Sequence, residues 1–242
     1  MNKFLILAIV INFTAVTFPQ QQKKYFDAPF GGGIGYVPAW YIPNFDPVNV
    51  ELKSIGMPEL STSGFYSSGG AGFIYFGFIK FLRVGGMGYG GSVTTSQTVD
   101  GVNREVVYNL GGGGITIEYT IPIIKDIALS VGAVIGAGNL EIQMFSNKGN
   151  FTWQETWEEF GSDTTDSFSR TLKNSFWMFT PTLNLDVPIN RFILVRLGAG
   201  YQIAFNDDWT ADNDQELDGV PSNLNANTFF VQSGIFIGFF SF

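Results

Sequence analysis

The sequence predicts an all-β protein, an eight-stranded antiparallel up-and-down β-barrel with one short helix near 46–56. Three observations predict this fold class. Apolar residues alternate with small or polar ones over long segments after Ser68, as in strands with two different faces. The expected connections alternate between short turns and long loops. The segment 227–242 is aromatic and β-branched, and its free edge would aggregate unless it pairs with another strand and closes a barrel.

The composition favours a barrel whose outer surface meets lipid. Only 14% of the residues are charged, against about 25% in ordinary soluble domains. The longest wholly apolar run, residues 4–11, is too short to cross a bilayer as a helix. It follows Lys3, and together they predict a signal peptide over 1–18 that leaves 19–242 as one barrel domain. A first β-strand is the alternative interpretation of this leading segment.

Residues 28–38 are expected to form the first strand, and the short helix follows at 46–56. The ends of the helix carry the prediction: Asp46 suits the N-cap, Pro47 the first helical position and Gly56 the C-terminal cap. Its apolar face is formed by Val48, Leu52 and Ile55. A helix with such a face can fold into the lumen as a plug or cap the loop end, and the pattern leaves both open.

The remaining strands follow from the alternation and from the turn residues between them. They are expected at 69–79, 82–98, 104–122, 127–145, 171–188, 192–205 and 228–242. Short turns are expected near 80–81, 123–126 and 188–191, and longer loops at 39–68, 99–103, 146–170 and 206–227. Trp153, Trp157 and Phe160 have helical spacing, but we interpret them as strand extensions rather than as a surface-binding patch.

The two faces of the strands decide whether lipid or water surrounds the wall. In 127–138 the odd positions are bulky and apolar, among them Ile127, Leu129 and Val131, whereas the even positions are mostly Ala, Ser or Gly. The same division recurs in 115–121, 177–187 and 193–205. A soluble barrel would turn the small, weakly charged face to water, where it would be poorly soluble. We therefore predict that the bulky face contacts lipid and that the small face lines a narrow lumen.

The leading signal, the alternating strands and the terminal GIFIGFFSF resemble the small outer-membrane β-barrel proteins of Gram-negative-type bacteria. The resemblance covers nearly all of 19–242, and the helix near 46–56 departs from its simplest members. It implies an outer-membrane location, contact with outer-membrane lipid, and contact with the barrel-assembly machinery during biogenesis. It also implies an assembly signal in the terminal aromatic residues Phe236, Phe240 and Phe242. Members of the family have diverse roles, so the resemblance alone does not determine function.

Three charged residues are expected on the lumen side at similar depth: Glu118, Asp186 and Arg196. Because buried charges must be paired, we predict a structural ion-pair network, with a proton or ion relay as the alternative. Glycines at 85–91 and 111–114 are expected to thin the lumen wall, which would leave room for the helix as a plug.

The chain contains neither histidine nor cysteine, which removes the usual bases, thiol nucleophiles and zinc ligands. We therefore expect no enzyme activity, cofactor or metal. A formal charge of −8 argues against nucleic acid as a partner. The predicted function is a structural or surface-interaction role through the loops 146–170 and 206–227, with an external partner that the sequence does not identify. The alternatives are a narrow channel or small-ligand carrier using a glycine-lined lumen, and a secreted soluble lipocalin-like barrel.

Overall fold

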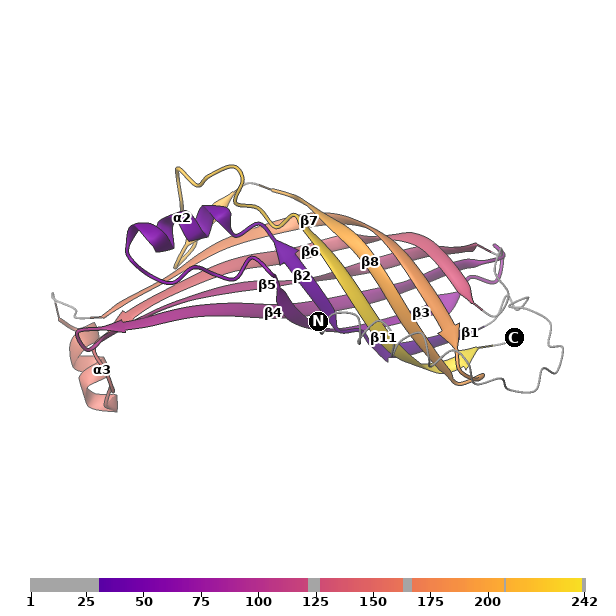
Figure 1. Ribbon diagram of the computed structural model, residues 1–242, viewed down its shortest axis with the longest axis horizontal. Coiled ribbons are helices and arrows are strands. Elements are labelled where there is room, and N and C mark those ends of the chain that lie inside the picture. Colours follow the sequence, from indigo (N-terminus) through magenta and orange to yellow (C-terminus); the bar gives the residue numbers. More distant parts are fainter. Residues whose placement is uncertain (1–30, 122–126, 163–166, 207, 241–242) are drawn as a thin grey trace, which may run out of the picture.

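The structure is a computed structural model that describes residues 31–121, 127–162, 167–206 and 208–240 (Figure 1). The predicted signal peptide and Phe242 lie outside the described residues. The wall contains β1 (Gly31–Tyr36) with β2 (Ala39–Pro43), β3 (Phe65–Tyr75), β4 (Leu82–Val99), β5 (Val102–Ile121), β6 (Ala128–Asn147), β7 (Phe168–Pro188), β8 (Ile193–Phe205) and β11 (Thr228–Phe240). At the loop end lie the helices α2 (Asp46–Ser54) and α3 (Trp153–Phe160) and the small strands β9 (Trp209–Ala211) and β10 (Gln215–Glu216). Neither described helix is long and apolar enough to cross a membrane.

The barrel closes because β1 and β2 together form one wall position. Both strands pair antiparallel with β11 on one side and with β3 on the other. Pro38 lies between them and cannot donate a backbone hydrogen bond, which accounts for the interruption. The prediction of an eight-stranded antiparallel barrel is confirmed. The terminal strand β11 lies between β8 and the first position, so its edges are paired.

Two predicted loops are shorter than expected. The loop predicted at 39–68 includes β2 and the first residues of β3. The loop predicted at 99–103 is a two-residue hairpin, in which Asp100 and Gly101 have φ angles of 51° and 77°. Positive φ at both central residues is typical of the tight turns that match the twist of paired strands. These corrections lengthen the sheet at the loop end.

The wall is much taller on one side than on the other. Strands β4 to β7 have 18, 20, 20 and 21 residues, whereas β3, β8 and β11 have 11, 13 and 13. Pairing of β3 with β4 stops at Gly91, and pairing of β8 with β7 stops at Trp177. Beyond these points the four long strands continue as a curved sheet, seen extending away from the barrel in Figure 1. We call this sheet the flange; it consists of residues 92–99, 102–110, 139–147 and 168–176.

The interpretation of Trp153, Trp157 and Phe160 as strand extensions is wrong, because they lie on the helix α3. Thr152 caps this helix: its hydroxyl accepts the Glu155 N–H, and the Glu155 carboxylate accepts the Thr152 N–H. This reciprocal pair is a capping box, which favours a helix over continued strand. Figure 1 shows α3 at the far end of the flange.

Candidate functional site

The structure brings Glu118, Asp186 and Arg196 together inside the barrel and adds Arg83 to them. Arg196 Nη1 and Nη2 both lie 3.1 Å from the Glu118 carboxylate, and its Nε lies 2.7 Å from Asp186 Oδ1. Arg83 Nη2 lies 2.9 Å from Glu118 Oε2, and Nη1 lies 2.5 Å from Asp186 Oδ2. Each carboxylate therefore contacts both guanidinium groups, and the four formal charges cancel.

Strand register places these four side chains. Arg83 on β4 lies directly opposite Glu118 on β5, and Asp186 on β7 lies directly opposite Arg196 on β8. The sequence analysis did not group Arg83 with the inward-facing charges, although this residue lies within the strand expected at 82–98 and is only 1% exposed. Alternation along β4 was the available signal, since Arg83 shares its face with the inward-facing Tyr89.

Polar and aromatic groups complete the surroundings of this charge network. Asn184 Nδ2 donates to Glu118 Oε1 at 2.8 Å, and Gln232 Nε2 donates to Asn184 Oδ1 at 2.7 Å. The Arg83 guanidinium lies 4.7 Å from the centre of the Phe73 ring, and that of Arg196 lies 4.9 Å from the centre of the Phe236 ring. Hydrogen bonds and cation–π contacts of this kind offset the loss of water around buried charges.

The glycines expected to thin the lumen wall do not all face the lumen. Gly86, Gly88 and Gly90 alternate with inward-facing Met87 and Tyr89, so these glycines lie on the outer face. Elsewhere, the space beside an inward-facing glycine is occupied by an aromatic ring from a neighbouring strand. A Cβ built on an inward glycine would lie 2.8 Å from the Phe240 ring at Gly33, 2.7 Å from Phe236 at Gly35, 2.6 Å from Phe176 at Gly138 and 2.6 Å from Phe230 at Gly200.

Aromatic side chains also fill the lumen toward the loop end. Tyr41 stacks on both Tyr89 and Phe230 with ring centroids 4.9 Å apart. The Tyr89 hydroxyl also contacts the Gln202 amide oxygen. Beside the charge network, the cavity lined by Glu118 and Arg196 has a volume of only about 10 Å³, about the space of one water molecule.

The helix α2 lies over the loop end and faces the flange, in the position of a cap (Figure 1). Val48 and Leu52 are buried in a cluster with Val106 of β5 and Ile142 of β6. Ile55 departs from the predicted apolar face, since it is the C-cap residue and 55% exposed.

The ends of α2 are close to the prediction. Pro47 lies in the first turn as expected, but the N-cap is Phe45 rather than Asp46. Gly56, with φ of 73°, follows the helix, and Met57 N–H donates to the Leu52 carbonyl at 2.9 Å. A left-handed glycine at this point ends a helix at little steric cost.

The terminal aromatic residues point into the barrel. Phe236 and Phe240 are fully buried and form a small core with Val37, Phe73 and Leu194. Phe242 lies outside the described residues, and the assembly signal stays a prediction.

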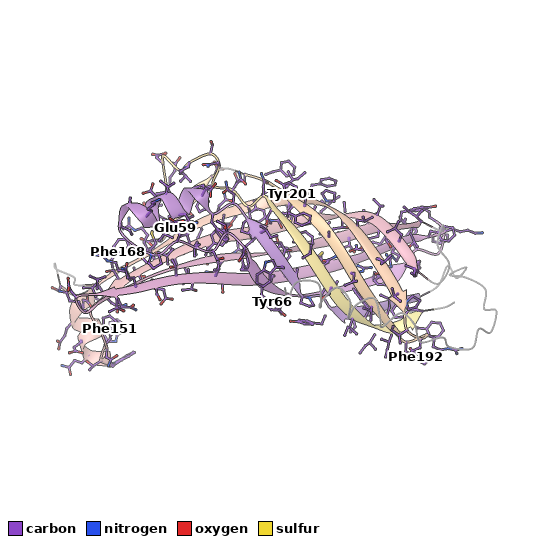
Figure 2. All side chains as sticks on the ribbon, in the orientation of Figure 1. Glu59, Tyr66, Phe151, Phe168, Phe192 and Tyr201 are labelled. Atoms are coloured by element: carbon purple, nitrogen blue, oxygen red, sulfur yellow. The ribbon has the colours of Figure 1, made fainter. Side chains whose placement is uncertain are left out.

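The outer surface of the wall is a band of bulky apolar side chains. Ile34, Ile135 and Ile237 are 75%, 54% and 65% exposed. Figure 2 shows Tyr66, Tyr201 and Phe192 projecting from the outside of the wall. A closed barrel with charge inside and such a band outside is built to contact hydrocarbon. The chain has the fold of the small outer-membrane β-barrel proteins.

Comparisons with solved structures found proteins of this class. The chain is similar to Ail, the attachment invasion locus protein of Yersinia pestis, in complex with a heparin analogue, with 12% identity and a TM-score of 0.46 over 87% of this chain and 99% of that one. It is similar to the N-terminal β-barrel domain of Pseudomonas aeruginosa OprF, with 10% identity and a TM-score of 0.40 over 86% and 97%. A major outer membrane protein from Thermus thermophilus has 6% identity and a TM-score of 0.46 over 86% and 99%. No protein-family model and no curated protein matches the chain.

Proposed function

We propose that the chain is a non-enzymatic integral outer-membrane protein that presents α3 at the cell surface as an interaction element. The observation that carries this proposal is the exposure of the aromatic residues of α3. Trp153, Trp157 and Phe160 are 79%, 58% and 83% exposed, and α3 has no buried residue. Exposed aromatic side chains of this kind are typical anchors of binding surfaces.

The aromatic residues of α3 form one continuous patch, and its acidic residues are engaged locally. The ring centroids of Trp153 and Trp157 lie 5.6 Å apart, and those of Trp157 and Phe160 lie 6.3 Å apart. Hydrogen bonds from Thr152 hold the pKa of the Glu155 carboxyl below its usual range. The Glu158 carboxylate accepts from Gln154 at 2.9 Å. The patch is therefore presented by a capped helix on a long sheet.

A first prediction concerns which end of the barrel faces outward. Because the chain has no cysteine, single substitutions give unambiguous labelling. We expect Gln154→Cys on α3 to react with a membrane-impermeant maleimide on intact cells. We expect Gly77→Cys, in the short turn between β3 and β4 where added atoms meet open space, to react only after the outer membrane is permeabilised. The reverse pattern would place α3 in the periplasm and overturn the proposal.

A second prediction concerns the aromatic patch itself. We expect cells displaying the triple variant Trp153→Ser, Trp157→Ser, Phe160→Ser to attach to hydrocarbon-coated glass beads about tenfold less than cells displaying the unmodified protein, because the exposed apolar anchors are removed. The matched control is Gln154→Ser, Thr156→Ser on the same helix, at equal surface density. Equal attachment of all three strains would show that the patch does not make the contact.

A third prediction tests the channel alternative. Because rings and the charge network fill the lumen, we expect the purified protein in planar bilayers to show no stable unitary conductance steps. Unitary steps that scale with salt concentration would instead support the channel.

A further inference from the structure

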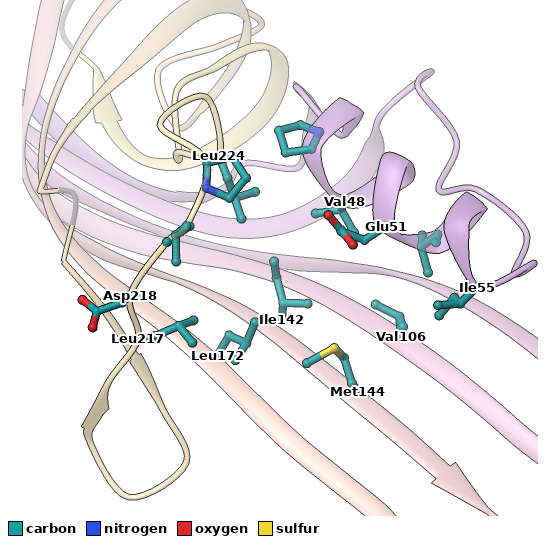
Figure 3. Close-up of a pocket in the computed structure, with 15 residues that line it drawn as sticks. Val48, Glu51, Ile55, Val106, Ile142, Met144, Leu172, Leu217, Asp218 and Leu224 are labelled. Atoms are coloured by element: carbon teal, nitrogen blue, oxygen red, sulfur yellow. The ribbon is translucent and has the colours of Figure 1, made fainter.

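An apolar cleft separates α2 from the flange (Figure 3). Its volume is about 310 Å³, at the lower end of the roughly 300–1,000 Å³ typical of small-molecule sites. The flange supplies Val106, Ile142 and Leu172, and α2 supplies Val48. Leu224 closes one side from the segment 217–224. Water in so apolar a cleft has few hydrogen-bond partners, so its displacement by an apolar molecule is favourable.

The helix α2, which forms one wall of the cleft, is fixed mainly through its first half. Phe45, just before the helix, packs edge-on against Tyr108 with ring centroids 5.0 Å apart. Asn49 makes two hydrogen bonds to the backbone of Leu60, at 3.0 Å and 2.8 Å. These contacts fix the first half of the helix, while Ile55 at its far end lines the cleft and remains half exposed.

The charged residues that line the cleft are both acidic. They are Glu51 of α2 and Asp218 of the segment 217–224, and neither forms an ion pair with another described residue. The flange also carries cations near the cleft, but none of them lines it: Arg170 lies directly opposite Met144 and its Nε is 3.2 Å from Asp212 Oδ2, and Arg104 and Lys173 lie close to Val106 and Leu172 along their strands. The entrance to the cleft therefore favours a cation over an anion.

We propose that this cleft binds a small apolar molecule that carries an amine. The alkyl part occupies the space above Val106 and Ile142, and the ammonium group lies at the rim of the cleft, which carries Glu51 on the α2 side and Asp218 on the side of the segment 217–224. This site is separate from the aromatic patch on α3 and goes beyond the surface-contact role, since it takes a small ligand rather than a large partner.

The test uses methionine methyl groups as local reporters. The protein is incorporated in lipid nanodiscs with carbon-13 in its methionine methyls; Met144 lines the cleft, while Met87 and Met178 lie in the lumen core. We expect hexylamine to shift the Met144 signal saturably and to leave Met87 and Met178 unchanged. We expect hexanoate to bind at least about tenfold more weakly. Equal shifts of all three methionines, no Met144 shift, or equal binding of hexanoate would each overturn the proposal.

Two kinds of variant distinguish binding of hexylamine in the cleft from its partitioning into the surrounding lipid. Val106→Phe fills the cleft, and Val220→Trp fills it from the opposite side; each is expected to abolish the Met144 response to hexylamine. The pair Glu51→Gln, Asp218→Asn is expected to remove the preference for amine over carboxylate. Asp214→Asn, in the exposed turn between β9 and β10, is the matched control and is expected to bind like the unmodified protein. Persistence of the response in both filling variants would place the ligand elsewhere.

Discussion

Replacing Glu118 with alanine is expected to destabilise the folded barrel strongly. The substitution removes one carboxylate from a neutral cluster and leaves Arg83 and Arg196 sharing Asp186 alone, so one buried positive charge loses its compensation. Breaking one partner out of a buried ion-pair cluster costs about 3–5 kcal/mol. The measurement is the temperature at which the compact form is lost on a heat-modifiable gel, together with the urea midpoint of unfolding in lipid vesicles.

Two further variants identify the cause. Glu59→Ala removes an exposed carboxylate at the loop end and is expected to leave the transition unchanged. The double variant Glu118→Ala, Arg83→Met restores neutrality and is expected to recover a large part of the lost stability, because Arg196 and Asp186 remain paired. A Glu118→Ala variant that unfolds like the unmodified protein would exclude a structural role and favour the relay alternative.

Substituting Gly200 with alanine is expected to give the second largest effect. A Cβ at this position would lie 2.6 Å from Phe230 Cζ and 2.8 Å from the Pro181 carbonyl oxygen. Phe230 is 1% exposed and stacked on Tyr41, so it cannot move without disturbing the lumen core. Overpacking of this kind costs about 1–3 kcal/mol. Urea unfolding of the refolded protein in vesicles measures the loss.

Gly90→Ala is the matched control, since it adds the same methyl group to the outer face, where no atom lies within 4 Å. It is expected to be neutral. Adding Phe230→Leu to Gly200→Ala should relieve the clash with the ring, so the double variant should lose less stability than the sum of its single changes. If the stability losses of the two single changes simply added, the Phe230 ring would not be the group for which Gly200 leaves space.

Alternation between apolar and small residues was sufficient to predict most of the wall strands, the eight-stranded barrel and the side that faces outward. This alternation is a local property with a period of two residues, so it can be recognised in each strand without knowing which strands lie beside it. Arg83 was missed although it lies within the strand expected at 82–98, because it stands next to the start of that strand, and boundaries are the weakest part of such predictions. The capping box of Thr152 and Glu155 was present in the sequence, but the helical spacing of the aromatic residues was weighed below strand continuation.

Which groups pack against the glycines, and where α2 lies, both depend on tertiary structure. Which ring lies against Gly138 or Gly200 is set by the register between strands far apart in the chain, and a single sequence does not contain that register. The same holds for the plug or cap alternative, because the apolar face of α2 can pack against either surface. The tight turn at Asp100 and Gly101 extends the first hairpin of the flange by a few residues where a loop was expected.

The unequal height of the wall makes the two sides of the loop end different from each other. The tall half, made by β4 to β7, screens one side of the loop end with strands, while β3, β8 and β11 stop lower, so that α2 and the segment 217–224 cover the inner face of the flange instead. The inner face of the tall half is therefore closed by hydrogen-bonded strands on one side and by a helix and a loop segment on the other, so the two sides of the loop end differ in how easily they can move apart.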